Sequence, residues 1–217
     1  MADALTSILH TPSSQPQHLL VLLHGWGANA QDVAGLAEVL QLPNWAMAFP
    51  NAPFASPYSP GGYMWYSFPE GSLDNLLGLD QPDLQESRER LRTWLTHLTE
   101  RLEVPLERTV LGGFSQGGAM SLDLGPQLPI AGIMSLSGYL HRAIAPADKA
   151  VPTLLVHGTQ DTVVPLRAAW QAREQLTAID TPLDYHEFSM GHEISPAVLN
   201  LIQSFTEHRG AKREESE

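Results

Sequence analysis

Uninterrupted apolar runs alternate with amphipathic stretches along this chain, and this alternation limits its fold more than any other feature does. The first run, residues 19–23, is apolar at every position. Such continuity is typical of a strand buried on both faces of a parallel sheet. Strands alternating with helices predict an α/β fold whose mostly parallel central sheet is flanked by helices. The other predicted strands cover residues 45–49, 109–112, 130–136, 153–156 and 183–188.

Three segments carry apolar residues every three or four positions, which is the spacing of one helix face. The second of them begins at Pro165, a residue suited to the first turn of a helix, and the third runs from Ile194 to Phe205. In the first, Arg88 occupies the one position of the apolar stripe that is not apolar. That stripe consists of Leu84, Leu91, Leu95, Leu98 and Leu102.

The composition indicates one folded domain without a nucleic-acid partner. Of 217 residues, 43% are apolar and 17% are charged, and we expect a single domain over residues 1–209 followed by a charged, frayed tail at 210–217. The net charge of −12 argues against nucleic-acid binding and against adsorption to anionic membranes. The chain has no cysteine, which excludes disulfides and a thiol nucleophile. With neither a signal peptide nor a membrane span recognisable, we expect a cytoplasmic protein without stable membrane insertion.

The predicted strand at 109–112 runs into the sequence Gly-Gly-Phe-Ser-Gln-Gly-Gly, which contains G-x-S-x-G with Ser115 at its centre. This pattern is typical of a sharp turn from a strand into a helix that exposes the serine hydroxyl. Gly113 and Gly117 flank the serine because side chains there would collide across the turn. The alternative is a glycine-rich turn between a strand and a helix whose serine faces solvent and has no catalytic role. The helix-compatible residues that follow favour the nucleophile turn.

A serine hydroxyl is a weak nucleophile at neutral pH, so it needs a base, and the base needs an orienting acid. On this strand–turn–helix arrangement the acid follows the serine in the chain and the histidine comes last. Asp161 follows the predicted strand at 153–156 and is the best-placed acid, although it could equally cap the turn before Pro165. Less well placed are Asp148, Asp180 and Asp184.

His192 lies in a loop between the last predicted strand and the last helix, where the base is expected. His186 falls inside that strand and His208 lies near the tail, so both are weaker candidates. Two backbone N–H groups should hold the oxyanion of the reaction. We expect them at Gln116, the residue after the nucleophile, and at Trp26, in the glycine-rich loop after the first strand.

One long stretch, residues 51–82, interrupts the alternation and is rich in proline, glycine and aromatic residues. A long irregular segment in a compact domain commonly serves function, and packing over the edge of the sheet is an equally good interpretation. Leu73, Leu76 and Leu77 are predicted to line a groove for an acyl chain, or else to pack as a small apolar cluster.

These blocks together resemble the phospholipase/carboxylesterase family, which includes the acyl-protein thioesterases. The resemblance rests on residues 23–27, 113–120, 157–165 and 191–193, in the family's order. It implies an α/β-hydrolase fold without a separate cap domain, no metal, no cofactor, and a triad of Ser115, Asp161 and His192. Residues 64–66 lie where family members carry a tryptophan-containing substrate loop, so the resemblance also implies that Trp65 and Tyr66 contribute to substrate binding. Trp26 and Ala28 depart from the aliphatic and acidic residues common in the family, which bears on the substrate more than on the chemistry.

We therefore predict a serine hydrolase that cleaves small carboxylic esters or thioesters through an acyl-enzyme on Ser115. A lipase, a lysophospholipase or an acyltransferase would use the same three residues. A ligand-binding module on a hydrolase fold would be expected to lack one of them. Ester or thioester preference, acyl length and oligomeric state stay open at this point.

Overall fold

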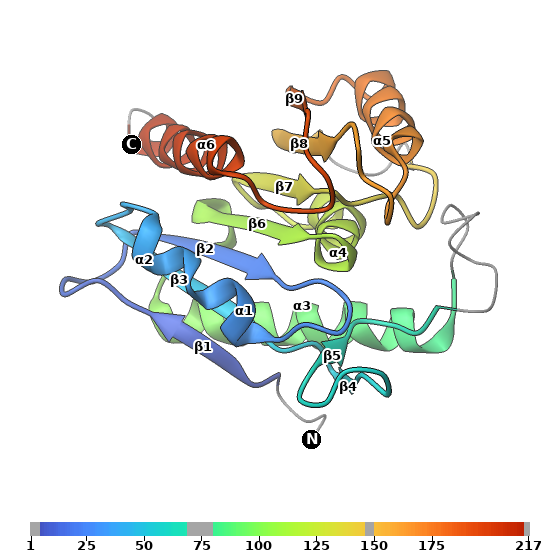
Figure 1. The fold of residues 1–217 in the computed structure, drawn as a ribbon. Coiled ribbons are helices and arrows are strands. Elements are labelled where there is room, and N and C mark those ends of the chain that lie inside the picture. The colour runs from blue at the N-terminus through green and yellow to red at the C-terminus, as the bar shows by residue number, and fades with distance from the viewer. Residues whose placement is uncertain (1–4, 69–79, 146–149, 215–217) are drawn as a thin grey trace.

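A seven-stranded sheet forms the centre of the computed structural model, which describes residues 5–68, 80–145 and 150–214 (Figure 1). Its strand order is β1-β3-β2-β6-β7-β8-β9, and every neighbouring pair is parallel except β1 with β3. The predicted mostly parallel sheet is confirmed. The strands are β1 Ser7–His10, β2 His18–Leu23, β3 Trp45–Pro50, β6 Thr109–Phe114, β7 Gly132–Leu136, β8 Thr153–Gly158 and β9 Leu183–Phe188.

The sequence predicts six of these strands and misses β1. This edge strand has four residues, none of them buried, so it lacks an apolar run that could mark it. Two further short strands, β4 Phe54–Ala55 and β5 Tyr63–Met64, pair with each other in a separate hairpin within the aromatic stretch. Strands of two residues are too short to leave a periodic signal in the sequence.

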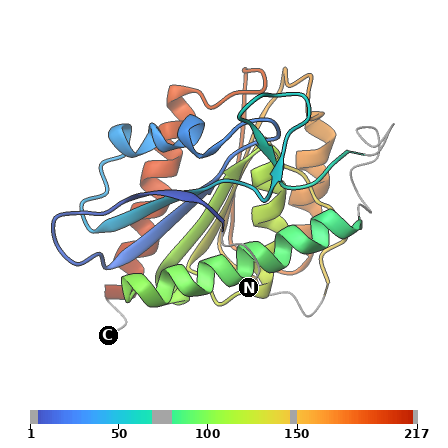
Figure 2. The same cartoon turned by 90° about the horizontal axis from the view of Figure 1, so that it is seen from below.

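Helices cover both faces of the sheet, as the continuous apolar strands require (Figure 2). On β2, Leu19, Val21 and Leu23 belong to one apolar core cluster with helical residues from 84–102, 119–124 and 168–176, whereas Leu20 and Leu22 belong to another with helical residues from 30–34 and 198–205. Burying one such side chain stabilises the fold by about 1.5–3 kcal/mol. The helices are α1 Ala30–Ala34, α2 Leu36–Val39, α3 Pro82–Leu102, α4 Gln116–Leu124, α5 Leu166–Ala178 and α6 Pro196–Glu214, with short 3₁₀ turns at Leu106–Arg108 and Gly125–Gln127.

The final helix α6 extends to Glu214. The chain is therefore helical through residues 210–214, where the sequence suggested a frayed tail beginning at residue 210. Gly210 lies close to the ring of Trp45: a Cβ added to this glycine would be 3.3 Å from the nearest ring atom. Among the described residues, no helix combines the length and the apolar character needed to cross a bilayer.

The parallel strands of the sheet place their carboxyl ends at one edge. β2 leads into the loop at residues 24–29, β6 into Ser115, β8 into the turn with Asp161, and β9 into the loop with His192. Ligands of open α/β sheets bind at this edge. The fold therefore gathers residues that are far apart in the sequence around one place.

Candidate active site

Ser115 lies between the last residue of β6 and the first residue of α4. Its backbone has φ 54° and ψ −116°, a strained conformation for a residue with a side chain. The N–H of Ser115 donates to the carbonyl of Leu136 at 2.8 Å, and its carbonyl accepts from the N–H of Ala119 at 3.0 Å. These two bonds hold the turn, so the strain is sustained by the surrounding sheet and helix.

The two glycines of the motif are required by close backbone contacts. A Cβ on Gly113 would lie 2.4 Å from the carbonyl carbon of Gly117. A Cβ on Gly117 would lie 2.3 Å from the carbonyl oxygen of Leu23, at the end of β2. The predicted collision across the turn is confirmed, and the second contact shows that the turn also packs against the neighbouring strand.

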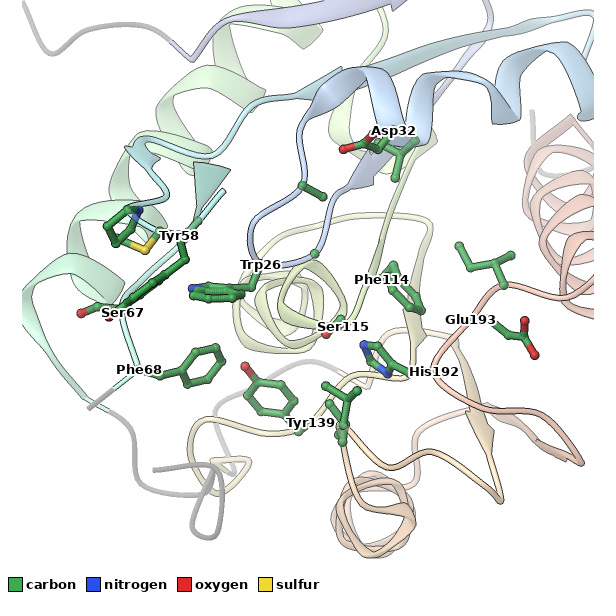
Figure 3. A pocket seen from close by; sticks show the side chains of 18 residues that line it. Trp26, Asp32, Tyr58, Ser67, Phe68, Phe114, Ser115, Tyr139, His192 and Glu193 are labelled. Carbon is green, nitrogen blue, oxygen red and sulfur yellow. The ribbon is translucent and has the colours of Figure 1, made fainter. Parts of the chain in front are cut away.

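His192 Nδ1 and Asp161 Oδ2 lie 2.7 Å apart, within hydrogen-bond distance. The Asp161 side chain is fully buried, and its other oxygen accepts the N–H groups of Val163 and Val164 at 2.9 and 2.8 Å. With a carboxylate at Nδ1, the ring keeps its proton there and turns Nε2 away from Asp161. His192 and Ser115 both line one cleft, and the His192 ring packs on Phe114 with 4.6 Å between ring centres (Figure 3).

Asp161 has a second histidine neighbour that the sequence did not single out. Buried His157, on β8, places Nε2 2.8 Å from the carbonyl of Val164 and 3.5 Å from Asp161 Oδ2. Burial lowers the pKa of His157 below its ordinary value of 6.5, against the smaller upward effects of Val164 and Asp161. The ring is therefore neutral at neutral pH and holds the turn that presents Asp161.

The two residues expected to supply oxyanion donors lie on either side of Ser115. Gln116 is the first residue of α4, where backbone N–H groups have no partner within the helix. The loop with Trp26 follows β2, and a Cβ on Gly25 would lie 3.4 Å from the Ser115 Cβ. This loop is fixed by a bond from the Gly27 N–H to the Tyr63 carbonyl at 2.8 Å and one from the Tyr63 N–H to the Ala28 carbonyl at 2.7 Å.

Trp65 and Tyr66 lie beneath the cleft and do not line it, so their predicted contact with substrate is corrected. Both are fully buried. The Gln116 side chain joins them, because its Oε1 accepts the Trp65 N–H and its Nε2 donates to the Tyr66 carbonyl, both at 2.8 Å. The Trp65 indole N–H donates to the His24 carbonyl at 3.0 Å. They therefore brace the two loops that carry the expected oxyanion donors.

His24 has a bracing role in the same region. Its Nε2 accepts the N–H of Ala52 at 3.0 Å, so Nδ1 carries the proton and donates to the Gly25 carbonyl at 2.7 Å. Burial lowers the pKa of His24, outweighing the opposite effects of Gly25 and Asp32. A neutral, fully buried ring with both nitrogens bonded is a structural component of the loop.

A polar network continues beneath Tyr66 and reaches α3 and α4. The Tyr66 hydroxyl bonds to the Tyr139 hydroxyl and lies 2.7 Å from His141 Nε2. His141 Nδ1 lies 3.7 Å from Asp123 Oδ2, and the buried Asp123 carboxylate also binds Arg88. Burial alone would raise the pKa of Asp123, but its hydrogen bonds and charge interactions with His141 and Arg88 lower it below 3.8. In the sequence, the one sign of this ion pair was that Arg88 occupies a position of the otherwise apolar stripe of α3.

The cleft above Ser115 has a volume of about 760 Å³ and walls that are mainly apolar. Leu73, Leu76 and Leu77 fall outside the described residues, so their groove stays a prediction. Among the described residues, no three side chains of His, Cys, Asp or Glu are grouped so that they could hold a metal ion. The side chains that line the cleft include Trp26, Asp32, Val33, Tyr58, Met64, Phe68, Phe114, Tyr139, Val163, His192, Glu193 and Ile194.

The sequence profile of the phospholipase/carboxylesterase family matches residues 6–209 of this chain. The chain belongs to this family. The crystal structure of esterase PE8 superposes with a TM-score of 0.85 at 27% identity, covering 95% of this chain and 99% of that one. A Bacillus cereus carboxylesterase shares the fold, with a TM-score of 0.79 at 15% identity over 96% of each chain.

Family members with similar sequences bear names that indicate thioester chemistry. Acyl-protein thioesterase 1 homolog 1 of Dictyostelium discoideum is 30% identical over 86% of this chain and 88% of its own. Acyl-protein thioesterase 1 of Schizosaccharomyces pombe is 28% identical over 94% of this chain and 98% of its own. The chain is accordingly a carboxylesterase/thioesterase-type hydrolase with the α/β-hydrolase fold.

Proposed function

We propose that Ser115 is the nucleophile of this hydrolase, His192 its general base and Asp161 the acid that orients His192. One observation carries the proposal. The His192 ring, held 2.7 Å from buried Asp161, lines the same cleft as Ser115, which lies on the strained turn after β6. The three residues come from separate loops, and each has the chemistry that its role demands.

The reaction proceeds in two halves. His192 Nε2 takes the proton of Ser115 Oγ as the oxygen bonds to the carbonyl carbon of the ester or thioester. The carbonyl electrons become an oxyanion, held by the N–H groups of Gln116 and Trp26. When the intermediate collapses, the bond to the leaving oxygen or sulfur breaks, and His192 gives the leaving group its proton. Water then repeats the sequence on the acyl-enzyme, which releases the acid and restores the Ser115 hydroxyl.

The buried carboxylate supports the assigned direction of proton transfer. Asp161 is held by two backbone N–H groups and faces Nδ1, so Nε2 is the nitrogen that exchanges protons with Ser115. The carboxylate stabilises the imidazolium that forms during each half-reaction without taking its proton. Relatives named acyl-protein thioesterases and esterases support esters and thioesters alike as substrates.

Replacing Ser115 with alanine tests the assignment. We expect kcat for a short p-nitrophenyl ester to fall by about 10⁴-fold or more with the fold intact, as for other serine triads. A fluorophosphonate should label the wild-type protein once, at Ser115, and should fail to label the variant. A variant with normal melting temperature and full esterase activity would show that another residue is the nucleophile.

A further inference from the structure

The cleft around Ser115 has two ends of different chemistry (Figure 3). On one side of Ser115 lie Trp26, Tyr58, Phe68 and Tyr139, which form an aromatic arm. Within this arm the Trp26 ring lies 5.7 Å from the Tyr58 ring and 6.3 Å from the Phe68 ring, measured between ring centres. This arm offers apolar surface and carries no charged side chain among its described residues.

The other end forms an acidic arm around His192. Phe114 packs on the His192 ring, and Glu193 and Ile194 directly follow His192 in its loop. Asp32, on α1, also lines the cleft. The two arms meet at Ser115, so a substrate whose carbonyl reaches the serine must extend into both.

The proton transfers fix which part of the substrate enters which arm. His192 gives its proton to the leaving oxygen or sulfur, so that atom must face the imidazole. The leaving group therefore extends along the side of the cleft that contains His192, Glu193 and Asp32. The acyl chain, on the other substituent of the carbonyl carbon, is directed to the aromatic arm.

Among the described residues that line the cleft, no cation neutralises the negative charge of the acidic arm. Glu193 makes no hydrogen bond or ion pair with any described residue, and its side chain is exposed. Asp32 accepts the N–H of Asn29 at 2.9 Å, which caps α1. No lysine or arginine occurs among the described residues that line the cleft. The net charge of −12 adds a negative field over the whole molecule.

We infer that the enzyme binds the acyl chain in the aromatic arm and the leaving group beneath Asp32 and Glu193, and that it prefers alcohols or thiols carrying a positive charge as leaving groups. This inference rests on the roles proposed for Ser115 and His192. Leaving groups that carry carboxylate or phosphate are disfavoured by the same field. A thiol flanked by basic side chains has the chemistry that this arm would recognise.

Three butyryl thioesters of similar size test the preference. Their leaving groups are thiocholine, which is cationic, 3,3-dimethylbutanethiol, which is neutral, and 3-mercaptopropionate, which is anionic. Because these thiols differ in intrinsic reactivity, the informative quantity is how each kcat/KM changes between wild type and variant. The variants are Asp32→Asn, which keeps an oxygen to cap α1, Glu193→Gln, and the pair together.

We expect the double variant to lose roughly 5- to 10-fold in kcat/KM for the thiocholine ester, to keep its rate on the neutral ester, and to gain on the anionic one. The wild-type preference should shrink as ionic strength rises from about 0.01 M to about 0.5 M, because the screening length falls. Glu38→Gln on α2 is the matched control, since it removes the same charge from an exposed position that does not line the cleft.

A second substrate pair tests the orientation. The two substrates are p-nitrophenyl esters with the same leaving group, one with a cationic 4-(trimethylammonio)butyryl chain and one with its uncharged isostere, 5,5-dimethylhexanoyl, so that they differ in charge only on the acyl side. Their rate ratio should not respond to the two substitutions. If it does respond, or if the double variant treats the three thioesters as wild type does, the inference is overturned. Failure of wild type to hydrolyse any of these substrates would instead contradict the proposed function.

Discussion

The floor of the candidate site and its mouth are built in different ways. Beneath Ser115, Gln116, Trp65 and His24 are fully buried, and each makes hydrogen bonds to the backbone of a different loop. Around the mouth, the side chains of Trp26 and Tyr58 are 39% and 79% exposed and contact mainly each other and Phe68. The floor is tied to the sheet, whereas the mouth is an apolar surface open to solvent.

This difference separates two tasks. A reaction that depends on hydrogen-bond geometry needs groups held within fractions of an ångström, which buried and mutually bonded residues provide. Recognition of acyl chains and leaving groups needs area and charge, which exposed side chains provide without fixed geometry. Substitutions in the floor should therefore alter kcat and stability together, and substitutions at the mouth should alter selectivity alone.

The largest effect is expected from Asp161→Asn, which removes the charge but keeps the shape. An asparagine can present its amide N–H₂ to His192 and so favour the wrong tautomer, with the proton on Nε2. We expect kcat to fall about 10⁴-fold, with KM changed little. Steady-state kinetics on a p-nitrophenyl ester measures both constants.

The effect of Asp161→Asn also distinguishes a catalytic carboxylate from a structural one. Asparagine can still accept the N–H groups of Val163 and Val164, so the melting temperature should stay within a few degrees of wild type. Near-normal kcat would show that Asp161 serves only as a cap for this turn.

The next largest effect is expected from Gln116→Met, which keeps the length of the side chain and removes its polar groups. The Trp65 N–H and the Tyr66 carbonyl would then lose their buried partner. Leaving such groups unsatisfied costs about 1–3 kcal/mol each, and the loop bearing the second oxyanion donor would lose its support. We expect kcat to fall about 10²-fold and unfolding to require less urea.

Gln116→Met has a control away from the site. Thr206→Val, on α6, removes a buried hydroxyl that donates to the Ile202 carbonyl at 2.7 Å, and Thr206 does not line the cleft. It should lower stability and leave kcat unchanged. Equal loss of kcat in the two variants would mean that general loosening, and not the Gln116 bonds, reduces activity.

The third prediction concerns Arg88, whose guanidinium binds buried Asp123 at the outer end of the floor network. Arg88→Met leaves that carboxylate buried with less compensation and should cost about 3 kcal/mol at neutral pH. Because the folded-state pKa of Asp123 is lowered, its stabilising contribution is present above the unfolded pKa and is lost as pH falls through the folded pKa. The difference between variant and wild type should therefore shrink toward about pH 4 and below.

Urea unfolding of both proteins across this pH range measures that difference. Arg142→Met is the control, because Arg142 is more exposed and lies 3.4 Å from Asp123 Oδ1. Its cost should be smaller. A difference for Arg88→Met that stays constant with pH would mean that lost packing of the arginine side chain, and not the charge of Asp123, explains the effect.

The sequence predicts the residues proposed for catalysis better than the buried residues of the floor that support them. Continuous apolar runs are a local signal, so six strands and the three longest helices could be placed. Gly113 and Gly117 signal a turn without side chains, and the structure shows why each is required. The meeting of Asp161 and His192 follows from strand order, because parallel strands present their ends at one edge of the sheet.

The supporting residues could not be predicted from the sequence, because their roles depend on which way each side chain points and on partners distant in the chain. Trp65 and Tyr66 lie in an irregular stretch without periodicity, so nothing in the sequence says whether their rings point inward or outward. Asp123 and Arg88 lie 35 residues apart, and Arg88 revealed only that one position of an apolar face is polar. The pairing itself is a property of how α3 and α4 pack.

The smallest effect is expected at the mouth, from Tyr58→Ala. Tyr58 is 79% exposed and its ring packs on Trp26, so its loss should change the free energy of unfolding by less than about 0.5 kcal/mol. For an acetate ester kcat should stay near the wild-type value, since the acyl chain is too short to reach the aromatic arm. For a long-chain ester KM should rise roughly 3-fold, because the ring no longer covers part of the bound chain. Comparing acetate with longer esters on both proteins measures this, and an equal loss for every acyl length would place Tyr58 in the support of Trp26 and its loop, which would make the mouth part of the fixed structure beneath it.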